Sequence, residues 1–336
     1  MKLPDEIQFL SSAFQTQKTT DSRMDGKVSI ITGATSGVGY HAAKRLAEGG
    51  STLVLVCRNA DKAEGVRKEL IQAHNAKIDI VAADFSKLSD VRKAAAYILK
   101  NYKQIDVLIN NAGLHRTTRT LTEEGFETVF CVNHLASFLF TRLLLERMLE
   151  NAPSRVIQVN SEGHRFGGLD LDDLNWERRP YRGLKGYGAS KVAQLLTVWE
   201  LADLLEGTGV TINAMHPGAV KSNIGMDNGF LYKWSQRLFV RPFLRKTKIS
   251  GDAIYYLAAA PEMQNTSGKF FNQTVEENPM PIAMDRKLGK RVWKVSEDLT
   301  GLPRMALAVD NAHDLMEQGE QIGRTQLSQI KRLSGG

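Results

Sequence analysis

Cysteine is scarce in this chain. Among 336 residues only Cys57 and Cys131 occur, and each falls in an element that we expect to be buried. Two buried cysteines of this kind indicate reduced thiols rather than a disulfide. Reduced thiols are typical of an intracellular compartment.

Long hydrophobic runs are also missing. No run approaches the ~18 to 20 apolar residues that cross a bilayer, so we expect no transmembrane segment. The start of the sequence, Met1 to Glu6, lacks a basic region followed by an apolar core, so we expect no signal peptide. The predicted location is the cytoplasm, and a peripheral contact with a membrane stays open.

Features of nucleic-acid binding are absent too, although the net charge is +7. No stacking motif or helix-turn-helix pattern accompanies this charge, which is spread along the chain. We therefore expect no nucleic-acid partner, and we predict no metal site. One basic stretch, residues 233–248, alternates with aromatic and aliphatic side chains. It fits either a membrane-interface contact or a flap over a substrate pocket, and we favour the flap because of the turn upstream, His216-Pro217-Gly218.

The chain does have a regular alternation of β-branched runs and amphipathic helices from residue 27 to about 275. Its 42% hydrophobic and 24% charged content is typical of a soluble globular protein. The alternation predicts an α/β fold, a doubly wound, Rossmann-like parallel sheet with ligands at the carboxyl ends of its strands. We expect a single domain at residues 25–303, with extensions at 1–24 and 304–336 that form flexible arms or surface helices. The predicted strands are 28–31, 52–56, 78–82, 107–109, 156–159, 211–214 and 269–271.

A glycine-rich turn, residues 32–39, follows the first predicted strand. Gly33 and Gly37 allow the backbone to turn tightly and approach phosphates, and Gly39 lets the next helix pack closely on the sheet. The helix N-terminus offers free N–H groups and a partial positive charge to a pyrophosphate. A plain strand-to-helix turn would also use glycines for positive φ angles. Three glycines at this spacing favour a dinucleotide site made of Gly33, Thr35, Ser36, Gly37, Val38 and Gly39.

The second predicted strand ends without the acidic residue that an NAD site usually has. Cys57 and Arg58 stand where that acid would accept the ribose hydroxyls. The planar guanidinium of Arg58 can pair with the 2′-phosphate of NADP, although a solvated surface arginine would give the same pattern. We therefore predict that NADP(H) is favoured over NAD(H).

A second motif lies on a predicted helix far downstream. Tyr187 and Lys191 are four residues apart and so share a helix face. A free tyrosine has a pKa of about 10. A cation about 4 Å away, at an effective dielectric of about 20, contributes roughly 4 kcal/mol, which would lower that pKa by about 3. The phenol could then exchange a proton near neutral pH, whereas the same pair on an unrelated helix would indicate only an aromatic ring packed beneath a lysine.

With these residues, the chain resembles the short-chain dehydrogenase/reductase family from about Gly26 to Leu302. The resemblance implies a catalytic set of four residues, each with its own role. Ser161 holds the substrate oxygen, and Tyr187 transfers a proton to or from it. Lys191 lowers the pKa of the tyrosine and holds the nicotinamide ribose, and Asn133 fixes a water that relays the proton.

The same resemblance implies further cofactor contacts. Asp84 matches a position that binds the adenine, and Asn110 to Gly113 matches a motif that supports the sheet and the cofactor. His216 to Gly218 matches a turn near the nicotinamide, with Val220 as a backbone contact. His164 fits a pocket or loop position better than an extra acid, because the proton path is already complete. The implied cofactor residues outside the glycine turn are Arg58, Asp84, Asn111, Ala112, Gly113, Tyr187, Lys191, Pro217, Gly218 and Val220.

Details of spacing favour one branch of this family. Ser161 and Tyr187 are 26 residues apart, with an insertion that contains residues 171–176. This insertion, Val132 to His134 and Cys57 to Asn59 look like the retinol-dehydrogenase group of NADP-dependent reductases. The resemblance implies hydride transfer between NADP(H) and a carbonyl or alcohol of a bulky apolar substrate, such as a retinoid, a steroid or a lipid aldehyde.

Two alternatives stay open. Residues 290–302 are also shared in outline with protochlorophyllide reductases, which would make the chain a reductase of carbon–carbon double bonds. A non-catalytic dinucleotide-binding scaffold would need the glycine turn but not Ser161 and Tyr187 together, so the full set favours an enzyme. Formation of a homo-oligomer is open as well.

Overall fold

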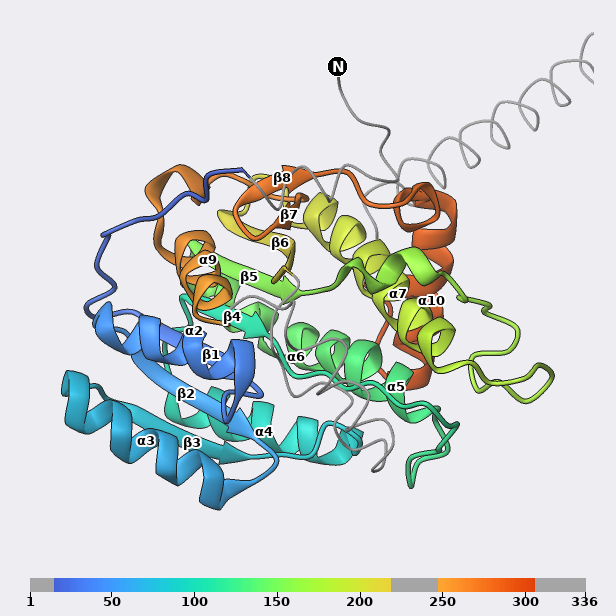
Figure 1. The fold of residues 1–336 in the computed structure, drawn as a ribbon, viewed down its shortest axis with the longest axis horizontal. Helices are drawn as coiled ribbons and strands as arrows, with labels where there is room; N and C mark the ends of the chain where they lie inside the picture. Colours follow the sequence, from blue (N-terminus) through green and yellow to red (C-terminus); the bar gives the residue numbers. More distant parts are fainter. Residues whose placement is uncertain (1–14, 219–246, 306–336) are drawn as a thin grey trace, which may run out of the picture. The chain divides into compact units, whose positions relative to one another are not determined.

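Eight strands form one sheet in the computed structural model, which describes residues 15–218 and 247–305 (Figure 1). The strand order is β3-β2-β1-β4-β5-β6-β7-β8, and neighbours are parallel except for the antiparallel pair β7–β8. The chain divides into two units, Met1–Leu302 and Pro303–Gly336, and the sheet belongs to the first. The predicted doubly wound sheet is confirmed. The strands are β1 (Val28–Thr32), β2 (Thr52–Cys57), β3 (Ile78–Ala82), β4 (Val107–Asn110), β5 (Ser154–Val159), β6 (Val210–His216), β7 (Phe270–Asn272) and β8 (Val275–Glu277).

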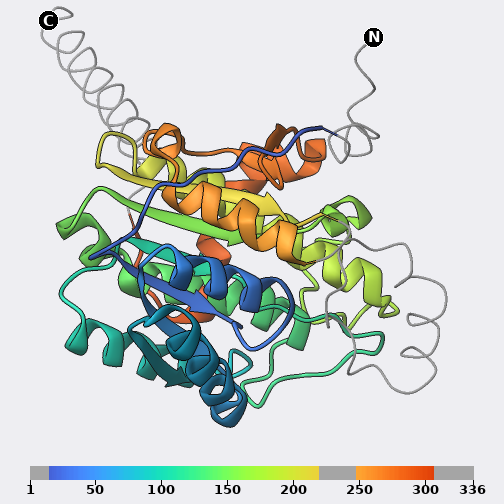
Figure 2. The ribbon, with the colours of Figure 1, turned by 60° about the vertical axis from the view of Figure 1, so that its left-hand side comes forward.

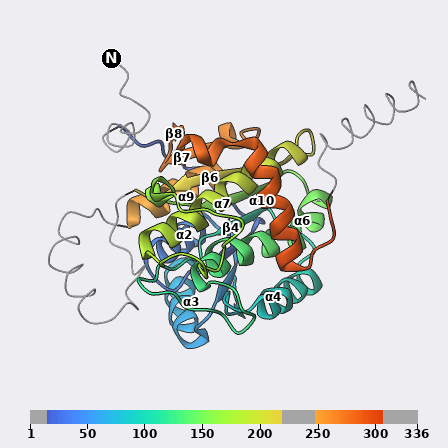
Figure 3. The same cartoon turned by 90° about the vertical axis from the view of Figure 1, so that its right-hand side faces the viewer.

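Helices cover both faces of this sheet (Figures 1 to 3). On one face, α2 (Gly37–Glu48) packs against α3 (Ala60–His74) and α9 (Lys248–Ala259). The other face is covered by α4 (Leu88–Asn101), α6 (Ala136–Glu150) and α7 (Gly183–Leu204), and α10 (Arg286–Thr300) packs on α7. The central strands are therefore buried on both sides, as in β2, where every residue from Leu53 to Cys57 is buried. Short helical turns complete this part of the chain: α5 (Thr128–Phe130), η1 (Cys131–Leu135), η2 (Glu162–Phe166), η5 (Pro261–Met263) and η6 (Pro281–Met284).

The edge strand β8 is an element that the sequence analysis does not predict. Asn272 pairs with Val275, so Gln273 and Thr274 form a two-residue hairpin turn. Gln273 has a φ angle of 57°, where glycine or asparagine is the usual choice. The turn is held from outside, because the backbone N–H of Gln273 donates to the carbonyl of His216 at 2.8 Å. Long-range contacts thus replace the usual turn residues.

Residues 15–24 also differ from expectation. They run without helix along the body of the domain, and the N–H of Lys18 donates to Oγ1 of Thr274 at 2.8 Å. The Tyr255 hydroxyl donates to the carbonyl of Ser22 at 2.6 Å, and Met24 is 4% exposed. This part of the predicted extension therefore packs on the domain instead of forming a flexible arm or a surface helix.

One helical stretch corrects the expectation about apolar runs. The stretch Thr128–Glu150 contains an 18-residue window with a mean hydropathy of 1.5, so it is long and apolar enough, by length and composition, to cross a membrane. Of its most apolar window, 89% is buried inside the protein, as expected for the central helix of a fold with two helical layers. The predicted burial of the cysteines is confirmed, since Cys57 and Cys131 are both buried, and both are free in this structure.

Candidate active site

The glycine-rich turn joins β1 to α2 at the carboxyl edge of the sheet (Figure 1). Gly33 and Gly37 have φ angles of +71° and +60°, a left-handed conformation that other residues rarely adopt. A Cβ atom at Gly39 would lie 2.4 Å from Nδ2 of Asn111 and from the carbonyl oxygen of Gly33. The backbone of this turn therefore requires all three glycines.

Among the residues that the structure describes, the N-terminus of α2 has no side-chain cap. Ser36 stands before the helix without making a side-chain cap, and the first turn contains no acidic residue. The unpaired N–H groups and the helix dipole therefore favour an anion here. A pyrophosphate group fits this turn, which also includes Thr35 and Val38.

The segment after β4 fastens the glycine turn to the sheet. Nδ2 of Asn111 donates to the carbonyl oxygens of Thr32 at 2.9 Å and Gly33 at 3.1 Å. Oγ1 of Thr32 accepts from the N–H groups of Asn111 at 3.0 Å and Ala112 at 2.9 Å. Thr32 was not among the predicted site residues, although it is the last residue of β1 and directly precedes the glycine turn.

The ends of β2 and β3 present the groups predicted to bind the adenosine half. Burial raises the pKa of Cys57 to about 11, so this thiol is uncharged at neutral pH and does not repel a phosphate. Arg58 follows it and is exposed. After β3, Oδ1 of Asp84 accepts from the N–H of Ser86 at 2.9 Å and from its Oγ at 2.8 Å. Oδ1 of Asp84 thus stabilises the loop that follows β3.

Asn133 lies in η1, a wide turn of π-helix between α5 and α6. Its fully buried side chain clamps Leu114: Oδ1 accepts from the N–H at 2.8 Å, and Nδ2 donates to the carbonyl at 3.0 Å. Nδ2 also donates to Oγ of Ser190 on α7 at 2.9 Å. A Cβ atom at Gly113 would lie 3.2 Å from Oδ1. Asn133 therefore ties the loop after β4 to the helix that contains Tyr187 and Lys191.

Ser161 and Tyr187 meet on either side of Gly163. Oγ of Ser161, at the start of η2, accepts from the N–H of Gly163 at 3.0 Å. A Cβ atom at Gly163 would lie 2.4 Å from Cε1 of Tyr187 and 3.3 Å from Oγ of Ser161. Glycine at this position thus allows the serine hydroxyl and the tyrosine ring to approach each other across 26 residues of sequence.

Tyr187 and Lys191 share one face of α7, as the spacing predicts. Nζ of Lys191 lies 5.7 Å from the centre of the Tyr187 ring, and the His115 ring packs edge-on against it with centroids 5.7 Å apart. Lys191 is only 3% exposed. Its ammonium donates to the carbonyl of Val159 at 3.1 Å and to Oε1 of Gln194 at 2.9 Å. Burial lowers the pKa of Lys191 to about 7.

His164 and His216 stand beneath the Ser161 turn. Nδ1 of His164 lies 2.8 Å from the carbonyl of Ser161, and Nε2 accepts from the N–H of Met280 at 3.2 Å. Burial lowers the pKa of His164 to about 4 and that of His216 to about 3. Both nitrogens of His164 are engaged in holding the loop, in agreement with the interpretation preferred from the sequence.

The turn after β6 is closely packed. The carbonyl of Pro217 accepts from Oγ of Ser250 at 2.6 Å and from Nε2 of Gln273 at 3.3 Å. Gly218 has a φ angle of +84°, and a Cβ atom there would lie 2.6 Å from Nε2 of Gln273. Val220 lies outside the described residues, and so does the basic stretch at 233–248 apart from residues 247 and 248.

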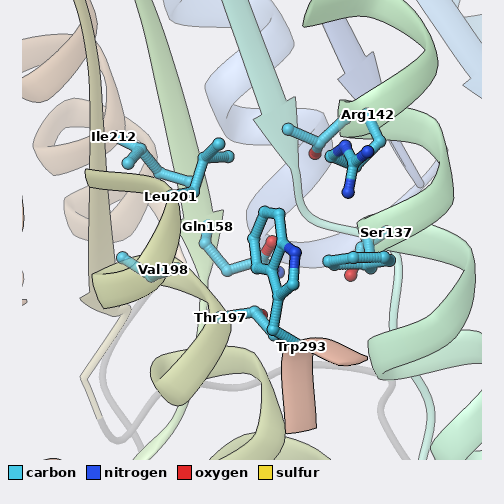
Figure 4. A pocket seen from close by; sticks show the side chains of 10 residues that line it. Ser137, Arg142, Gln158, Thr197, Val198, Leu201, Ile212 and Trp293 are labelled. Carbon is cyan, nitrogen blue, oxygen red and sulfur yellow. The ribbon is translucent and has the colours of Figure 1, made fainter. Parts of the chain in front are cut away.

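A small cavity of about 20 Å³ lies apart from these residues, between α6, α7 and α10 (Figure 4). Its wall includes Gln158, Trp293 and Arg142, whose guanidinium pairs with Glu297 at 2.7 Å. The volume holds about one water molecule, so it is too small for a bulky substrate. Within residues 15–218 and 247–305, no three His, Cys, Asp or Glu side chains are placed to hold a metal ion.

Sequence comparison places these motifs among known enzymes. The short chain dehydrogenase family model matches residues 27–229. Retinol dehydrogenase 13 of Homo sapiens is 37% identical over 282 residues, which cover 82% of this chain and 85% of that protein. Retinol dehydrogenase 12 of Mus musculus is 38% identical, with 84% and 89% covered. The family resemblance predicted from the motifs, including its retinol-dehydrogenase-like branch, is confirmed.

Solved structures agree on the fold. An uncharacterized protein from Mycobacterium paratuberculosis has a TM-score of 0.67 at 27% identity, covering 87% of this chain and all of that one (100%). The 3-ketoacyl-(acyl-carrier-protein) reductase from Brucella melitensis, complexed with NADH, has a TM-score of 0.57 at 28% identity, with 74% and 96% covered.

Proposed function

Because this chain belongs to the short-chain dehydrogenase/reductase family, we propose that it is an NADP(H)-dependent oxidoreductase of a bulky apolar carbonyl or alcohol. The observation that supports this most is the meeting of Ser161 and Tyr187 across Gly163, with Lys191 beneath the ring. These residues converge near the carboxyl edge of the sheet, where α/β folds bind ligands.

The cofactor would be held by residues suited to a dinucleotide. Gly33 and Gly39 let the turn pack tightly against the segment after β4, and Gly37 has the positive φ angle that starts α2. The uncapped N-terminus of α2 would then face the phosphates. Arg58 would pair with a 2′-phosphate, and the uncharged Cys57 thiol would not oppose it. Asp84 and the segment Asn111 to Gly113 would line the rest of the site, with Pro217, Gly218 and Val220 near the nicotinamide.

The nicotinamide, when bound, donates or accepts the hydride. In reduction, Ser161 would hold the substrate oxygen by a hydrogen bond from its hydroxyl, and Tyr187 would give that oxygen the proton of its phenol. Lys191 would stabilise the phenolate that remains. In oxidation, the same groups would act in reverse, with Tyr187 as the base.

An apolar substrate is supported by two exposed side chains near these groups. Phe166, at the end of η2, is 47% exposed, and Leu184, one turn before Tyr187 on α7, is 54% exposed. The relatives named retinol dehydrogenases agree with a substrate of this class. The Brucella melitensis reductase is complexed with NADH, so the preference of this chain for NADPH or NADH requires its own measurement.

The test is oxidation of NADPH and NADH, in parallel, with a panel of retinoid, steroid and lipid aldehydes and ketones. We expect alcohol products and faster turnover with NADPH, and Tyr187→Phe as the inactive control. A saturated ketone as the product would instead indicate a double-bond reductase. Tight cofactor binding without turnover of any substrate would indicate a scaffold.

A further inference from the structure

Gln194 joins the two ends of the predicted proton path. Its Nε2 donates to the backbone carbonyl of Asn133, and its Oε1 accepts from Nζ of Lys191 at 2.9 Å. The side chain is 2% exposed, so these bonds form away from bulk water. The Gln194 amide therefore connects Asn133 directly to Lys191, the two residues between which the family resemblance implies a proton relay.

The orientation of this amide is fixed by its partners. Oε1 also accepts from Nδ2 of Asn160 at 3.1 Å. Oδ1 of Asn160 in turn accepts from the N–H of Ser161 at 2.8 Å, and its Nδ2 also donates to the carbonyl of Lys191 at 3.0 Å. A backbone N–H can only donate and a backbone carbonyl can only accept. These backbone partners therefore place the oxygen of Gln194 toward Lys191 and its nitrogen toward Asn133.

We propose that Gln194 is a positioning residue that holds the Lys191 ammonium beneath Tyr187. An ammonium has three N–H donors, and Val159 and Gln194 accept two of them, which leaves one for the side of Tyr187 and the cofactor. A glutamine accepts and donates through different atoms, so unlike water it holds both neighbours without passing a proton between them. The role in turnover rests on the proposed function, but the effect on Lys191 does not.

The neighbours of Lys191 make its charge sensitive to Gln194. Burial opposes the ammonium, and a hydrogen bond accepted from the charged form favours it. Burial also lowers the pKa of the nearby histidines, to about 3 for His134 and about 4 for His164, so these rings stay neutral while Lys191 titrates. The titratable and charged groups around the site are Tyr187 on α7, His115 after β4, His134 on η1, Glu162, His164 and Arg165 on η2, and His216 on β6.

The experiment compares three variants of the full chain. Gln194→Met keeps the size and removes all three side-chain hydrogen bonds, including the one from Asn160. Gln194→Glu keeps the acceptor toward Lys191 but not the donor toward Asn133. Gln158→Met is the matched control, since Gln158 is a buried glutamine (5% exposed) of the Figure 4 cavity, and its Nε2 has no partner in the described part of the chain. The Lys191 pKa is read by NMR of protein with 13C-labelled lysine, with Lys191→Met assigning the signal. Turnover is measured with NADPH and the best carbonyl substrate.

We expect Gln194→Met to lower the Lys191 pKa and to reduce kcat by about 10- to 100-fold, with KM for the carbonyl changed less than about threefold. Gln194→Glu should raise the Lys191 pKa above that of wild type and recover part of kcat. Gln158→Met should match wild type in both measurements.

A wild-type Lys191 pKa in Gln194→Met, or an equal loss in Gln158→Met, would overturn the proposal. If Gln194→Met does not fold, Gln194→Glu still tests the proposal. An unchanged Lys191 pKa in Gln194→Glu would also contradict the proposed role of Gln194. A wild type that reduces no carbonyl would refute the proposed function alone, since the titration still reports on Gln194.

Discussion

The cofactor half and the catalytic half of the site are built by different physical means. The cofactor half presents mainly backbone: a turn with three glycines and an uncapped helix end, fastened by the side chain of Asn111. The catalytic half consists of buried side chains that hold one another, from Asn133 through Gln194 to Lys191. Cofactor binding should therefore weaken when atoms are added to the glycine turn. Turnover should fall when hydrogen bonds or charges are removed from the catalytic half.

The largest effect is expected from Tyr187→Phe. The change removes the phenolic proton but keeps the ring that packs on Gly163 and His115, so only the chemistry should suffer. We expect kcat to fall about 100-fold or more, while the affinity for NADPH stays within about threefold of wild type. Turnover with NADPH and cofactor binding by fluorescence would be measured on the same protein. Near-normal turnover would remove Tyr187 from the proposed acid–base role.

Arg58→Ala tests the cofactor half by charge instead of by shape. A hydrogen bond to a charged group contributes about 1.5 to 3 kcal/mol, or about 10- to 150-fold in affinity. We expect wild type to prefer NADPH over NADH at least about tenfold in kcat/KM, and Arg58→Ala to lose most of that preference through weaker use of NADPH. Cys57→Asp combined with Arg58→Ala should reverse it, because a carboxylate accepts ribose hydroxyls and repels a phosphate. An unchanged preference in Arg58→Ala would make this arginine a surface charge only.

Gly39→Ala tests the cofactor half by adding one methyl group. The new Cβ would meet Nδ2 of Asn111 and the carbonyl of Gly33 at 2.4 Å, so the turn must shift. We expect NADPH to bind about tenfold more weakly and Tm to fall, with a smaller loss of kcat at saturating cofactor than in Tyr187→Phe. Gly65→Ala on α3 is the control, since nothing lies within 4 Å of its added Cβ, and it should stabilise the fold by about 0.5–1 kcal/mol. Equal behaviour of the two variants would show that the turn tolerates the methyl group.

The same contrast explains what could be predicted from the sequence. The glycine turn and the Tyr187/Lys191 pair are local patterns with a fixed spacing, so the fold and its main motifs follow from them. The bridge by Gln194 depends on η1 and α7 being packed together, which no local pattern encodes. Its one sequence indication is its place three residues after Lys191, on the same helix face.

The turn before β8 was hidden for a related reason. Gln273 has a left-handed conformation in a turn that is held at Gln273 by His216 and at Thr274 by Gln17, whereas a sequence search looks for glycine or asparagine there. Likewise, Thr128–Glu150 escapes a search for unbroken apolar runs, because its apolar residues alternate with Thr, Ser, Asn and Arg. Tertiary contacts thus hold the turn, and burial inside the protein distinguishes the apolar helix from a membrane span.

The smallest expected effect is a change of the free energy of unfolding with pH, which only the catalytic half should show. Without cofactor, burial lowers the pKa of Lys191 from its ordinary 10.5 to about 7. Between these pH values the unfolded chain holds the proton and the folded chain does not, so the free energy of unfolding should rise with pH, by at most about 1.4 kcal/mol per pH unit. This contribution is complete above the unfolded pKa and is lost as the pH falls toward 7.

Lys191→Met removes that slope, so wild type should gain stability relative to the variant as the pH rises. Urea midpoints at pH 7, 8 and 9 would measure the difference, with Lys185→Met, an exposed lysine of the same helix, as the control that keeps the wild-type slope. Parallel curves for wild type and Lys191→Met would mean that the ammonium stays charged in the folded state. The hydrogen bonds to Gln194 and Val159 would then outweigh the cost of burial, and the contrast between the two halves would rest on hydrogen bonding alone.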